Sequence, residues 1–207
     1  LRVWVTLCPP SEQGGQWPNS EPYRLDFIRW ADEIGRLASE HGNLVAMVID
    51  DFWSAANHEL YSPEYIAQVV KALRAQCPTV AFLPTIYWET VGDPEWIESY
   101  GQYIDGIVFP YAELQTGDEL EGQLKACREW LGPDKLILVN VYASGSSGPA
   151  APGPRTEDYM RKTLTISRDL ADGIRVYCLP KDKLLEDHRY AVTAELYGKW
   201  RSEDAAQ

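Results

Sequence analysis

The sequence predicts an α/β fold, a parallel (β/α)8 barrel of the TIM type that is incomplete or lacks about two N-terminal βα units. Three observations favour this barrel over its alternative, an open parallel α/β sheet. No glycine-rich nucleotide-binding loop follows any strand-like run. Polar and aromatic residues gather at the carboxyl end of nearly every run, whereas an open sheet concentrates its site at one switch point. In several runs the polar residues occupy alternate positions, so they would all face one side of the sheet, as residues that line the interior of a barrel do.

The predicted strands are short runs rich in β-branched and aromatic residues, and each ends in polar residues. A loop and an amphipathic helix follow each run, at the spacing of βα units. This alternation, with apolar strands, predicts a parallel sheet covered by helices. The six predicted strands span residues 1–8, 44–50, 80–89, 106–113, 135–144 and 173–180.

The predicted helices begin at recognisable caps. Ser62-Pro63-Glu64 and Asp93-Pro94-Glu95 each place a capping side chain, a proline and an acid in the order that starts a helix, and Thr156 is followed by two acids. A last helix is expected over roughly 187–200. The residues at helical spacing are Ile66, Val69, Val70 and Leu73, then Leu120, Leu124, Cys127 and Leu131, and finally Tyr190, Ala194 and Tyr197.

Six strands fall short of the eight of a complete barrel. Three explanations stay open: the chain is a fragment of a longer protein, the barrel is incomplete, or the sheet is open. Residue 1 is Leu and lies inside a strand-like run, which indicates a processed or truncated chain with the missing units upstream. Residues 1–207 are expected to form one domain.

The charge balance argues against several classes of partner. The chain of 207 residues carries 31 acidic and 19 basic side chains, a net charge of −12. A nucleic-acid binder needs Lys and Arg to replace phosphate counterions, and an anionic membrane surface attracts the same residues. No apolar run approaches the roughly 20 residues of a membrane span. The expected partner is a small molecule or oligosaccharide, neutral or cationic, and neither nucleic acid nor a membrane.

The aromatic content is compatible with a sugar ligand, and the cysteine content bears on cofactors. Eight Trp and twelve Tyr stand against four Phe. Trp and Tyr combine a flat apolar face with one hydrogen-bond donor, which suits sugar rings, although the same residues also fill large cores. The four cysteines form no C-x-x-C pair and no zinc spacing, so free, buried thiols and no cofactor are expected. A secreted or periplasmic location is favoured over a cytoplasmic one.

The stretch "NLVAMVIDDFW" (43–53) raises the question of function, because a buried-looking strand ends in two adjacent carboxylates. Strand parity places Asp50 on the lumen side and turns Asp51 towards the helices. Glu89 and Glu113 follow two later strands on the polar parity. Each acid has an ordinary alternative role, capping the next turn or facing solvent.

In a barrel all strand ends converge on one rim, where these acids would meet aromatic and amide side chains. Glycoside hydrolysis requires two carboxyls that flank a bond, one protonated and one ionised, and neighbouring charge with an aromatic wall separates their pKa values. The catalytic candidates are Asp50, Asp51, Glu89 and Glu113. The candidates for substrate binding are Trp53, Tyr87, Trp88, Tyr111, Asn140, Tyr142 and Tyr177.

Three strand-end motifs, "VIDDFW", "PTIYWE" and "VFPYAE", resemble those of glycoside-hydrolase-type TIM barrels. The resemblance extends over about 1–200 and is one of pattern. The D-x-x-D-x-D-x-E run of chitinase-like barrels and the N-E-P strand end of another large glycosidase group are both absent. The resemblance therefore implies a class, carbohydrate-active barrels, with no substrate attached.

Three functions fit this inventory. In the first, the chain hydrolyses a glycosidic bond, with Asp50 as the ionised carboxylate and Glu113 or Glu89 as the acid. In the second, the barrel binds a sugar or small ligand without catalysis. In the third, the chain is a lyase or aldolase that depends on a divalent metal, held by the oxygen ligands at the strand ends. The residues considered for this site lie within ten positions of one another and are Asp50, Asp51, His58 and Glu59.

Two segments rich in Pro and Gly are predicted to lie at the rim. The first, 8–22, either presents Trp17 to a ligand or serves as a long crossover. The second, 144–155, is predicted to be a lid or rim loop, because the two acids that start the next helix would repel a phosphate.

Overall fold

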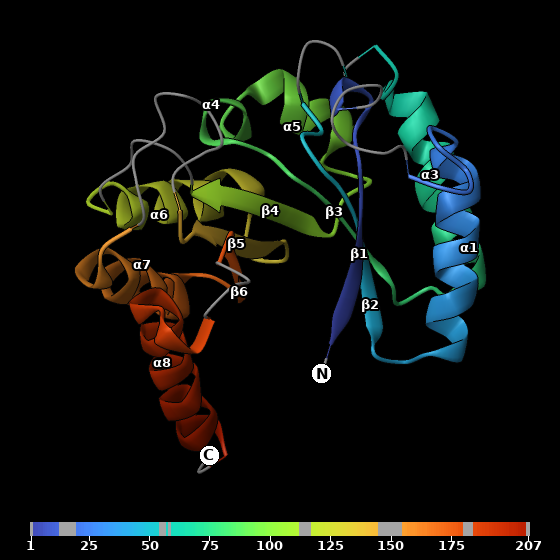
Figure 1. Ribbon diagram of the computed structural model, residues 1–207. Coiled ribbons are helices and arrows are strands. Elements are labelled where there is room, and N and C mark those ends of the chain that lie inside the picture. The colour runs from blue at the N-terminus through green and yellow to red at the C-terminus, as the bar shows by residue number, and fades with distance from the viewer. Residues whose placement is uncertain are drawn as a thin grey trace. The chain divides into compact units, whose positions relative to one another are not determined.

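The computed structural model describes residues 2–12, 20–53, 57, 59–111, 117–144, 155–179 and 184–205. It confirms an α/β fold with parallel sheets, and all six predicted strands are present at shorter lengths (Figure 1). The strands are β1 (Val3–Leu7), β2 (Leu44–Ile49), β3 (Ala81–Pro84), β4 (Gly106–Tyr111), β5 (Leu136–Tyr142) and β6 (Gly173–Tyr177).

The described strands form two three-stranded parallel sheets, ordered β1-β2-β3 and β4-β5-β6, and these do not make a full barrel. The predicted TIM-type barrel is therefore only partly confirmed. The largest departure lies in the predicted strand 80–89. β3 ends at Pro84, Thr85 makes an isolated bridge to Val108, and the chain turns into a helix at Trp88.

The chain divides into two compact units. The N-terminal unit comprises Leu1–Val108 with Glu129–Leu136, and the C-terminal unit comprises Phe109–Arg128 with Ile137–Gln207. Each unit has its own buried apolar residues. The single domain expected from the sequence stays a prediction.

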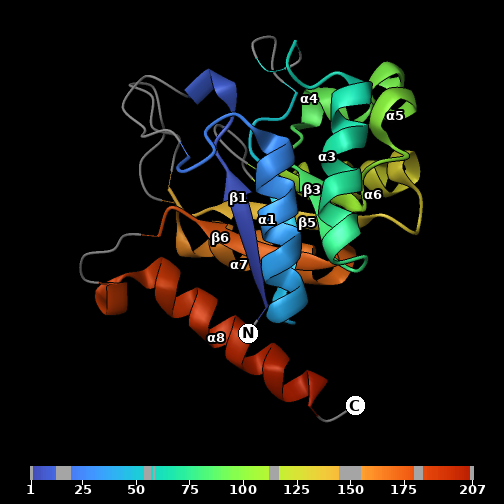
Figure 2. The ribbon, with the colours of Figure 1, turned by 90° about the vertical axis from the view of Figure 1, so that its right-hand side faces the viewer.

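In the N-terminal unit, two long helices lie side by side, as Figures 1 and 2 show. The described helices are η1 (Pro10–Glu12), α1 (Phe27–Glu40), α3 (Pro63–Gln76), α4 (Trp88–Val91) and α5 (Pro94–Tyr100). α3 begins where predicted, because the Ser62 hydroxyl accepts a hydrogen bond from Tyr65 N at 3.2 Å. Gly35 allows α1 to approach α3, since a Cβ there would collide with the Leu73 carbonyl oxygen. The buried face of α3 is the predicted one, Ile66, Val69, Val70 and Leu73.

Aromatic rings fill the core next to the carboxyl end of β2. Phe52 is fully buried, stacks on Tyr61 with ring centroids 5.0 Å apart, and meets the edge of Tyr100 at 5.4 Å. The Tyr100 hydroxyl donates to the Tyr61 carbonyl oxygen at 2.7 Å, which joins α5 to the segment that precedes α3. Close aromatic pairs stabilise a fold beyond the area they bury. The turn that carries Asp50 and Asp51 is therefore anchored by Phe52 in a packed core.

The C-terminal unit contains η2 (Leu184–Glu186), α7 (Glu157–Leu170), α8 (His188–Asp204) and most of α6 (Leu120–Leu131). α7 starts where predicted, with the Thr156 hydroxyl accepting from Tyr159 N at 3.2 Å. α7 and α8 pack on one another (Figure 1). On α8 the face singled out in the sequence is not the buried one, since Tyr197 is 38% exposed. The buried residues of α8 are Arg189, Val192, Thr193 and Leu196.

A buried ion pair fixes the start of α8. The Asp187 carboxylate caps the helix at Arg189 N (2.9 Å) and accepts two further hydrogen bonds from the Arg189 guanidinium, at 2.8 and 2.6 Å. Another guanidinium N–H donates to the Ala143 carbonyl oxygen, just past β5, at 2.7 Å. These hydrogen bonds lower the pKa of Asp187 to about 2. Arg189 is only 6% exposed, so the pair ties α8 to the carboxyl end of β5.

Two general expectations can be compared with the fold. Across the part of the chain that is described, no helix is long and apolar enough to cross a membrane. All four cysteines are free thiols, as expected, but the expectation that they are buried is correct only for Cys127. Cys8 and Cys77 are partly exposed, and Cys178 is exposed.

Candidate active site

The turn after β2 carries two adjacent carboxylates. β2 ends at Ile49, whose carbonyl oxygen accepts a hydrogen bond from Thr85 N at 2.9 Å. The next residue is tied to β1, because Asp50 N donates to the Leu7 carbonyl oxygen at 3.1 Å. Asp51 has a φ of 39°, in the left-handed region, so the chain turns sharply there. Strand parity therefore stops at Ile49, and the expectation that it turns Asp51 towards the helices does not apply.

The Asp51 carboxylate accepts a hydrogen bond of 2.7 Å from the Tyr87 hydroxyl. A predicted catalytic candidate thus contacts a predicted binding residue, which occupies the position before the first residue of α4, just after β3. The Asp50 carboxylate accepts from Asp51 N at 3.2 Å. Burial raises the pKa of Asp51, the Tyr87 hydrogen bond opposes that rise, and the negative charge of Asp50 adds to it.

A third carboxylate, Glu12, lies at the same place and was not among the sequence candidates. It ends η1, the short helix after β1, and its Oε2 accepts a weak hydrogen bond from the Cys8 thiol at 3.4 Å. Burial raises the pKa of Glu12, and the charges of Asp51 and Asp50 raise it further against the opposing thiol contact. We call Glu12, Asp50 and Asp51 the acid cluster. The available signal for Glu12 was its position four residues after a strand end, inside the predicted rim segment 8–22.

Asn57 fastens the two backbone segments that carry the acid cluster. Its side chain is fully buried and uses both of its polar atoms. The Oδ1 atom accepts from Ser11 N at 2.8 Å, while Nδ2 donates to the Ser11 hydroxyl at 3.0 Å and to the Asp51 carbonyl oxygen at 2.6 Å. A buried amide with these bonds satisfied fixes its partners in place. The position of Glu12, next to Ser11, is thereby coupled to the turn at Asp51.

The environment of Cys8 provides a chemical probe of the acid cluster. Burial, the hydrogen bond to Glu12 and the charges of the cluster raise the pKa of Cys8 to about 11. We therefore expect iodoacetamide at pH 8 to label Cys77, whose pKa is lowered by its contact with Thr79, and to leave Cys8 largely unmodified. Glu12→Gln should increase the rate of Cys8 labelling, because it removes a negative charge beside the thiol. Peptide mass spectrometry gives both rates, and an unchanged Cys8 rate would contradict the contact with Glu12.

The Tyr87 hydroxyl provides a second probe. It stabilises the ionised form of Asp51, so Tyr87→Phe should raise the pKa of the Asp51 carboxyl further. A ¹³C NMR titration of the carboxyl carbon measures this without any substrate. Tyr103→Phe is the matched control, because Tyr103 donates to none of the three acids. A pKa that is unmoved or lowered in Tyr87→Phe would show that the hydrogen bond is absent in solution.

Three more of the predicted residues lie in the N-terminal unit. Trp53 is half-buried and meets the edge of Tyr100 at 5.4 Å, in the same turn as the acid cluster. Trp88 opens α4 and packs on Trp130 of α6, with ring centroids 5.2 Å apart. Glu89 lies in the same helical turn and is exposed. The structure thus places Trp53 two residues after Asp51, with its ring against Tyr100, and Glu89 on the surface of α4.

The C-terminal unit holds four predicted binding residues at strand ends, and Tyr111 is the most enclosed. Tyr111 is fully buried, so its ring has no exposed surface for a ligand. Its hydroxyl donates to Glu119 at 3.0 Å and accepts from Gly117 N at 2.8 Å. The described contacts of Tyr111 are therefore internal ones.

The other three predicted binding residues, Asn140, Tyr142 and Tyr177, lie on one face of the sheet together with Arg175. Asn140 and Tyr142 of β5 stand in register with Arg175 and Tyr177 of β6, so the four side chains share one face of the sheet. The Arg175 Nε donates to Asn140 Oδ1 at 3.1 Å, and its guanidinium lies 5.7 Å from the Tyr177 ring centroid. The rings of Tyr142 and Tyr177 are 4.8 Å apart. We call these four residues the Arg175 platform.

Several candidates fall outside the described residues: Glu113, His58, Trp17 and most of the predicted lid, 145–154. The metal hypothesis can be examined only for the remainder. There, no group of three or more His, Cys, Asp or Glu side chains is arranged to hold a metal ion. Asp50 and Asp51 therefore have no further ligand of these types at coordinating positions in the described part of the chain.

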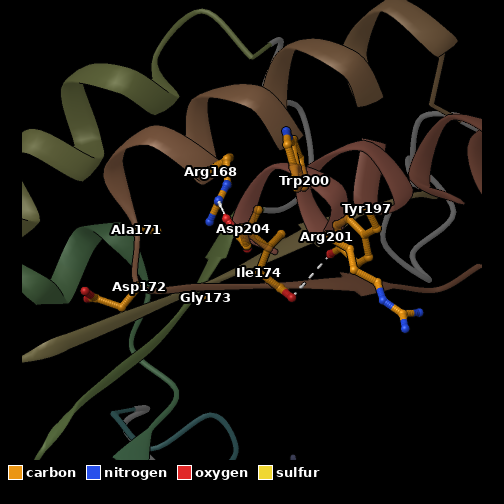
Figure 3. Close-up of a pocket in the computed structure, with 9 residues that line it drawn as sticks. All are labelled: Arg168, Ala171, Asp172, Gly173, Ile174, Tyr197, Trp200, Arg201 and Asp204. Carbon is orange, nitrogen blue, oxygen red and sulfur yellow. Dashed lines mark hydrogen bonds and ion pairs between the residues drawn. The ribbon is translucent and has the colours of Figure 1, made fainter. Parts of the chain in front are cut away.

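A hollow of about 380 Å³ lies at the opposite, amino end of β6, between α7 and α8 (Figure 3). Arg168 and Asp204 form an ion pair there, and the Tyr197 hydroxyl donates to the Ile174 carbonyl oxygen at 3.3 Å. The two paired charges neutralise one another. Parallel α/β barrels carry their reactive groups at the carboxyl ends of the strands. The acid cluster is therefore the stronger candidate for an active site.

No protein-family model matches the chain, and no curated protein matches its sequence. Solved structures do match its fold. A protein from Bacteroides thetaiotaomicron, proposed to be an α-L-fucosidase, matches with a TM-score of 0.57 and 12% identity over 80% of this chain and 60% of its own. The β-glucuronidase of Bacteroides uniformis matches with a TM-score of 0.58 and 14% identity over 86% of this chain.

A third match is a GH128 (subgroup I) endo-β-1,3-glucanase from Amycolatopsis mediterranei, in complex with laminarihexaose. It has a TM-score of 0.55 and 11% identity over 78% of this chain and 77% of its own. The present chain spans 60% of the fucosidase-like protein and 24% of the glucuronidase. At these identities the likeness concerns the fold. The resemblance to glycoside-hydrolase-type barrels is thereby confirmed at the level of the fold.

Proposed function

We propose that the chain is a carbohydrate-active enzyme that hydrolyses a glycosidic bond at the acid cluster. The observation that carries the proposal is the pair Glu12 and Asp51. Both have a raised pKa, and both are held at the carboxyl ends of neighbouring strands by Asn57. A carboxyl that holds its proton more strongly than a neighbouring carboxylate is the arrangement that protonates a leaving group and assists attack on the sugar.

The contacts favour different roles for the two carboxyls. Asp51 accepts a hydroxyl hydrogen bond of 2.7 Å from Tyr87, which stabilises a carboxylate. Among the described residues, the Glu12 carboxyl accepts a hydrogen bond from the Cys8 thiol alone, a weak donor, at 3.4 Å. When two nearby carboxyls compete for one proton, the one with the weaker donor keeps it. Glu12 is therefore proposed as the acid, and Asp51 as the carboxylate that acts as nucleophile or as base for a water.

Asp50 and Trp53 complete the proposed site. The charge of Asp50 raises the pKa of both Glu12 and Asp51, which favours one shared proton in the cluster. Trp53 follows the same turn and is half-buried, and an indole is suited to stack on a sugar ring. The proposal keeps Asp50 and Asp51 from the sequence candidates and adds Glu12 to them.

The fold matches support a saccharide as the substrate class. The matching structures are described as glycosidases and glucanases, and one of them was crystallised with laminarihexaose. Their activities belong to those proteins, and the chain spans only part of two of them. What supports the same chemistry here is the combination of that fold with two carboxyls of raised pKa at the strand ends.

The proposal is tested by offering the protein a panel of neutral and acidic oligosaccharides and measuring the reducing ends released. We expect cleavage of at least one member, lost in Asp51→Asn and kept in Glu64→Gln, an exposed acid at the start of α3. Binding of a saccharide with no cleavage anywhere in the panel would favour the non-catalytic barrel instead. Cleavage that survives in Asp51→Asn would remove the acid cluster from the mechanism.

A further inference from the structure

Arg175 is held in a fixed orientation at the carboxyl end of β6. Its Nε donates to Oδ1 of Asn140, at 3.1 Å, and Asn140 is 2% exposed on the neighbouring strand. Because the amide is buried and the two residues stand in register, the guanidinium plane is set by the sheet. Among the described residues, the N–H donors on the side of the guanidinium away from Nε make no hydrogen bond and can serve a ligand.

Arg175 differs from other partly buried arginines in its charge environment. Arg74 pairs with Asp105 at 2.9 Å, and Arg128 pairs with Asp172 at 2.7 Å. Arg189 is paired with Asp187 in the same way. Arg175, by contrast, has no carboxylate partner within the part of the chain that is described. In a chain with 31 acids and 19 bases, a half-buried cation without an acid is a local exception to the overall charge.

Two tyrosine rings lie beside this cation. Tyr142 and Tyr177 are 4.8 Å apart with their planes tilted by 51°, and Tyr177 is 43% exposed. Such rings present an apolar face to the C–H groups of a sugar and a hydroxyl to its polar edge. The Arg175 platform therefore combines a stacking surface with a forked cation, the geometry that recognises a carboxylate through two parallel hydrogen bonds.

We propose that the Arg175 platform binds an acidic saccharide, with the carboxylate of a uronic acid unit on Arg175 and its ring against Tyr142 and Tyr177. The saccharide part of this inference rests on the proposed function, whereas the anion part rests on Arg175 alone. It refines the expectation from net charge, which favours neutral or cationic ligands. The acidic side chains elsewhere on the protein are distant from Arg175, and salt screens their repulsion of an anionic ligand. The contact between Arg175 and a carboxylate is direct, so it can still select an anion.

The test measures binding rather than turnover, in protein that carries Asp51→Asn so that no ligand is consumed. Tetrasaccharides of galacturonic, glucuronic, mannuronic and guluronic acid are each compared with their carboxyl-reduced counterparts by titration calorimetry. The members of each pair share linkage and length and differ only in the carboxylate. Inorganic phosphate is titrated separately, as an anion without a sugar ring.

We expect at least one uronic tetrasaccharide to bind about 10-fold or more tightly than its reduced counterpart, the scale of one charge-assisted hydrogen-bond pair. Arg175→Gln should remove this preference and leave the affinity for the reduced sugar unchanged. Arg175→Lys should recover part of it, because it keeps the charge and loses the fork. Arg201→Gln, an exposed arginine of α8 by the hollow at the amino end of β6, is the matched control and should keep the full preference.

The inference is overturned by the absence of any uronic preference, by a preference that survives in Arg175→Gln, or by phosphate binding as tight as that of the best tetrasaccharide. These outcomes are separate from failure of the proposed function. Uronic binding that depends on Arg175, with no saccharide cleaved by the wild-type protein, would uphold this site and refute the hydrolase. If the wild-type protein cleaves only neutral sugars and Arg175→Gln does not change that cleavage, the hydrolase is upheld and the uronic acid site on Arg175 is refuted.

Discussion

Glu12→Gln is expected to lower kcat for an unactivated glycoside by about 10²- to 10⁴-fold, the usual contribution of a positioned general acid. The same variant should lose much less activity on an aryl glycoside with a good leaving group, because a phenolate departs without being protonated. Asp51→Asn should abolish turnover of both substrates, since the carboxylate assists the attack in either case. The ratio of the two rates therefore separates the acid from the carboxylate.

The control for this pair is Glu64→Gln, which removes an exposed acid and should leave both rates unchanged. Circular dichroism and a thermal melt establish that each variant is folded. Equal losses on the two substrates in Glu12→Gln would contradict a role in leaving-group protonation. If turnover is lost in Glu12→Gln and fully kept in Asp51→Asn, Asp51 is not the carboxylate that assists the attack, and another carboxylate must take that role.

Arg189→Leu is expected to lower the free energy of unfolding by about 3 to 5 kcal/mol, the cost of breaking a buried ion pair by removing one partner. The substitution strands the Asp187 carboxylate, which is otherwise held by the guanidinium, and removes the donor to the Ala143 carbonyl oxygen. Urea unfolding followed by fluorescence measures the change. The effect should exceed that of any single surface ion pair in the chain.

Arg161→Leu is the matched control for this prediction. Arg161 also makes two ion pairs, with Glu157 and Glu195, but its side chain is 38% exposed. Exposed pairs contribute about 0 to 1 kcal/mol, so Arg161→Leu should cost correspondingly little. Losses of equal size in the two variants would contradict the view that burial, rather than pairing alone, makes Arg189 important.

The same ion pair predicts a pH dependence of stability. The folded pKa of Asp187 is about 2, below its ordinary value of 3.8. A carboxyl with a lowered folded pKa contributes stability that is present above its unfolded pKa and is lost as the pH falls towards the folded value. The wild-type protein should therefore lose about 2 kcal/mol from this group between roughly pH 4 and pH 2. Asp187→Asn should remove that part of the acid dependence.

Much of the fold could be predicted because it is encoded locally. Apolar runs located all six strands, and the Ser62 and Thr156 caps located the starts of α3 and α7. Capping depends on a side chain and on backbone N–H groups two or three residues later, so it is visible in sequence. The burial of β2 and of the apolar face of α3 follows from periodicity in the same way.

The misses share a non-local cause. The alternation of a strand does not reach Asp51, because β2 ends at Ile49 and Asp51 itself has a left-handed backbone. Sequence does not reveal Glu12, because its raised pKa arises first from burial that only the fold creates, and then from the charges of Asp51 and Asp50, about 40 residues away in sequence. On α8, Arg189 lies on the buried face because a fixed Asp187 pairs with it, which hydrophobicity does not predict.

The most direct test of the central claim is a crystal structure of the Glu12→Gln variant with an oligosaccharide that the wild-type protein cleaves. The account predicts the scissile glycosidic oxygen within hydrogen-bonding distance of the side chain at position 12, the anomeric carbon facing Asp51, and a sugar ring against Trp53. A saccharide seated instead in the hollow between α7 and α8, with none at the carboxyl end of β2, would contradict it.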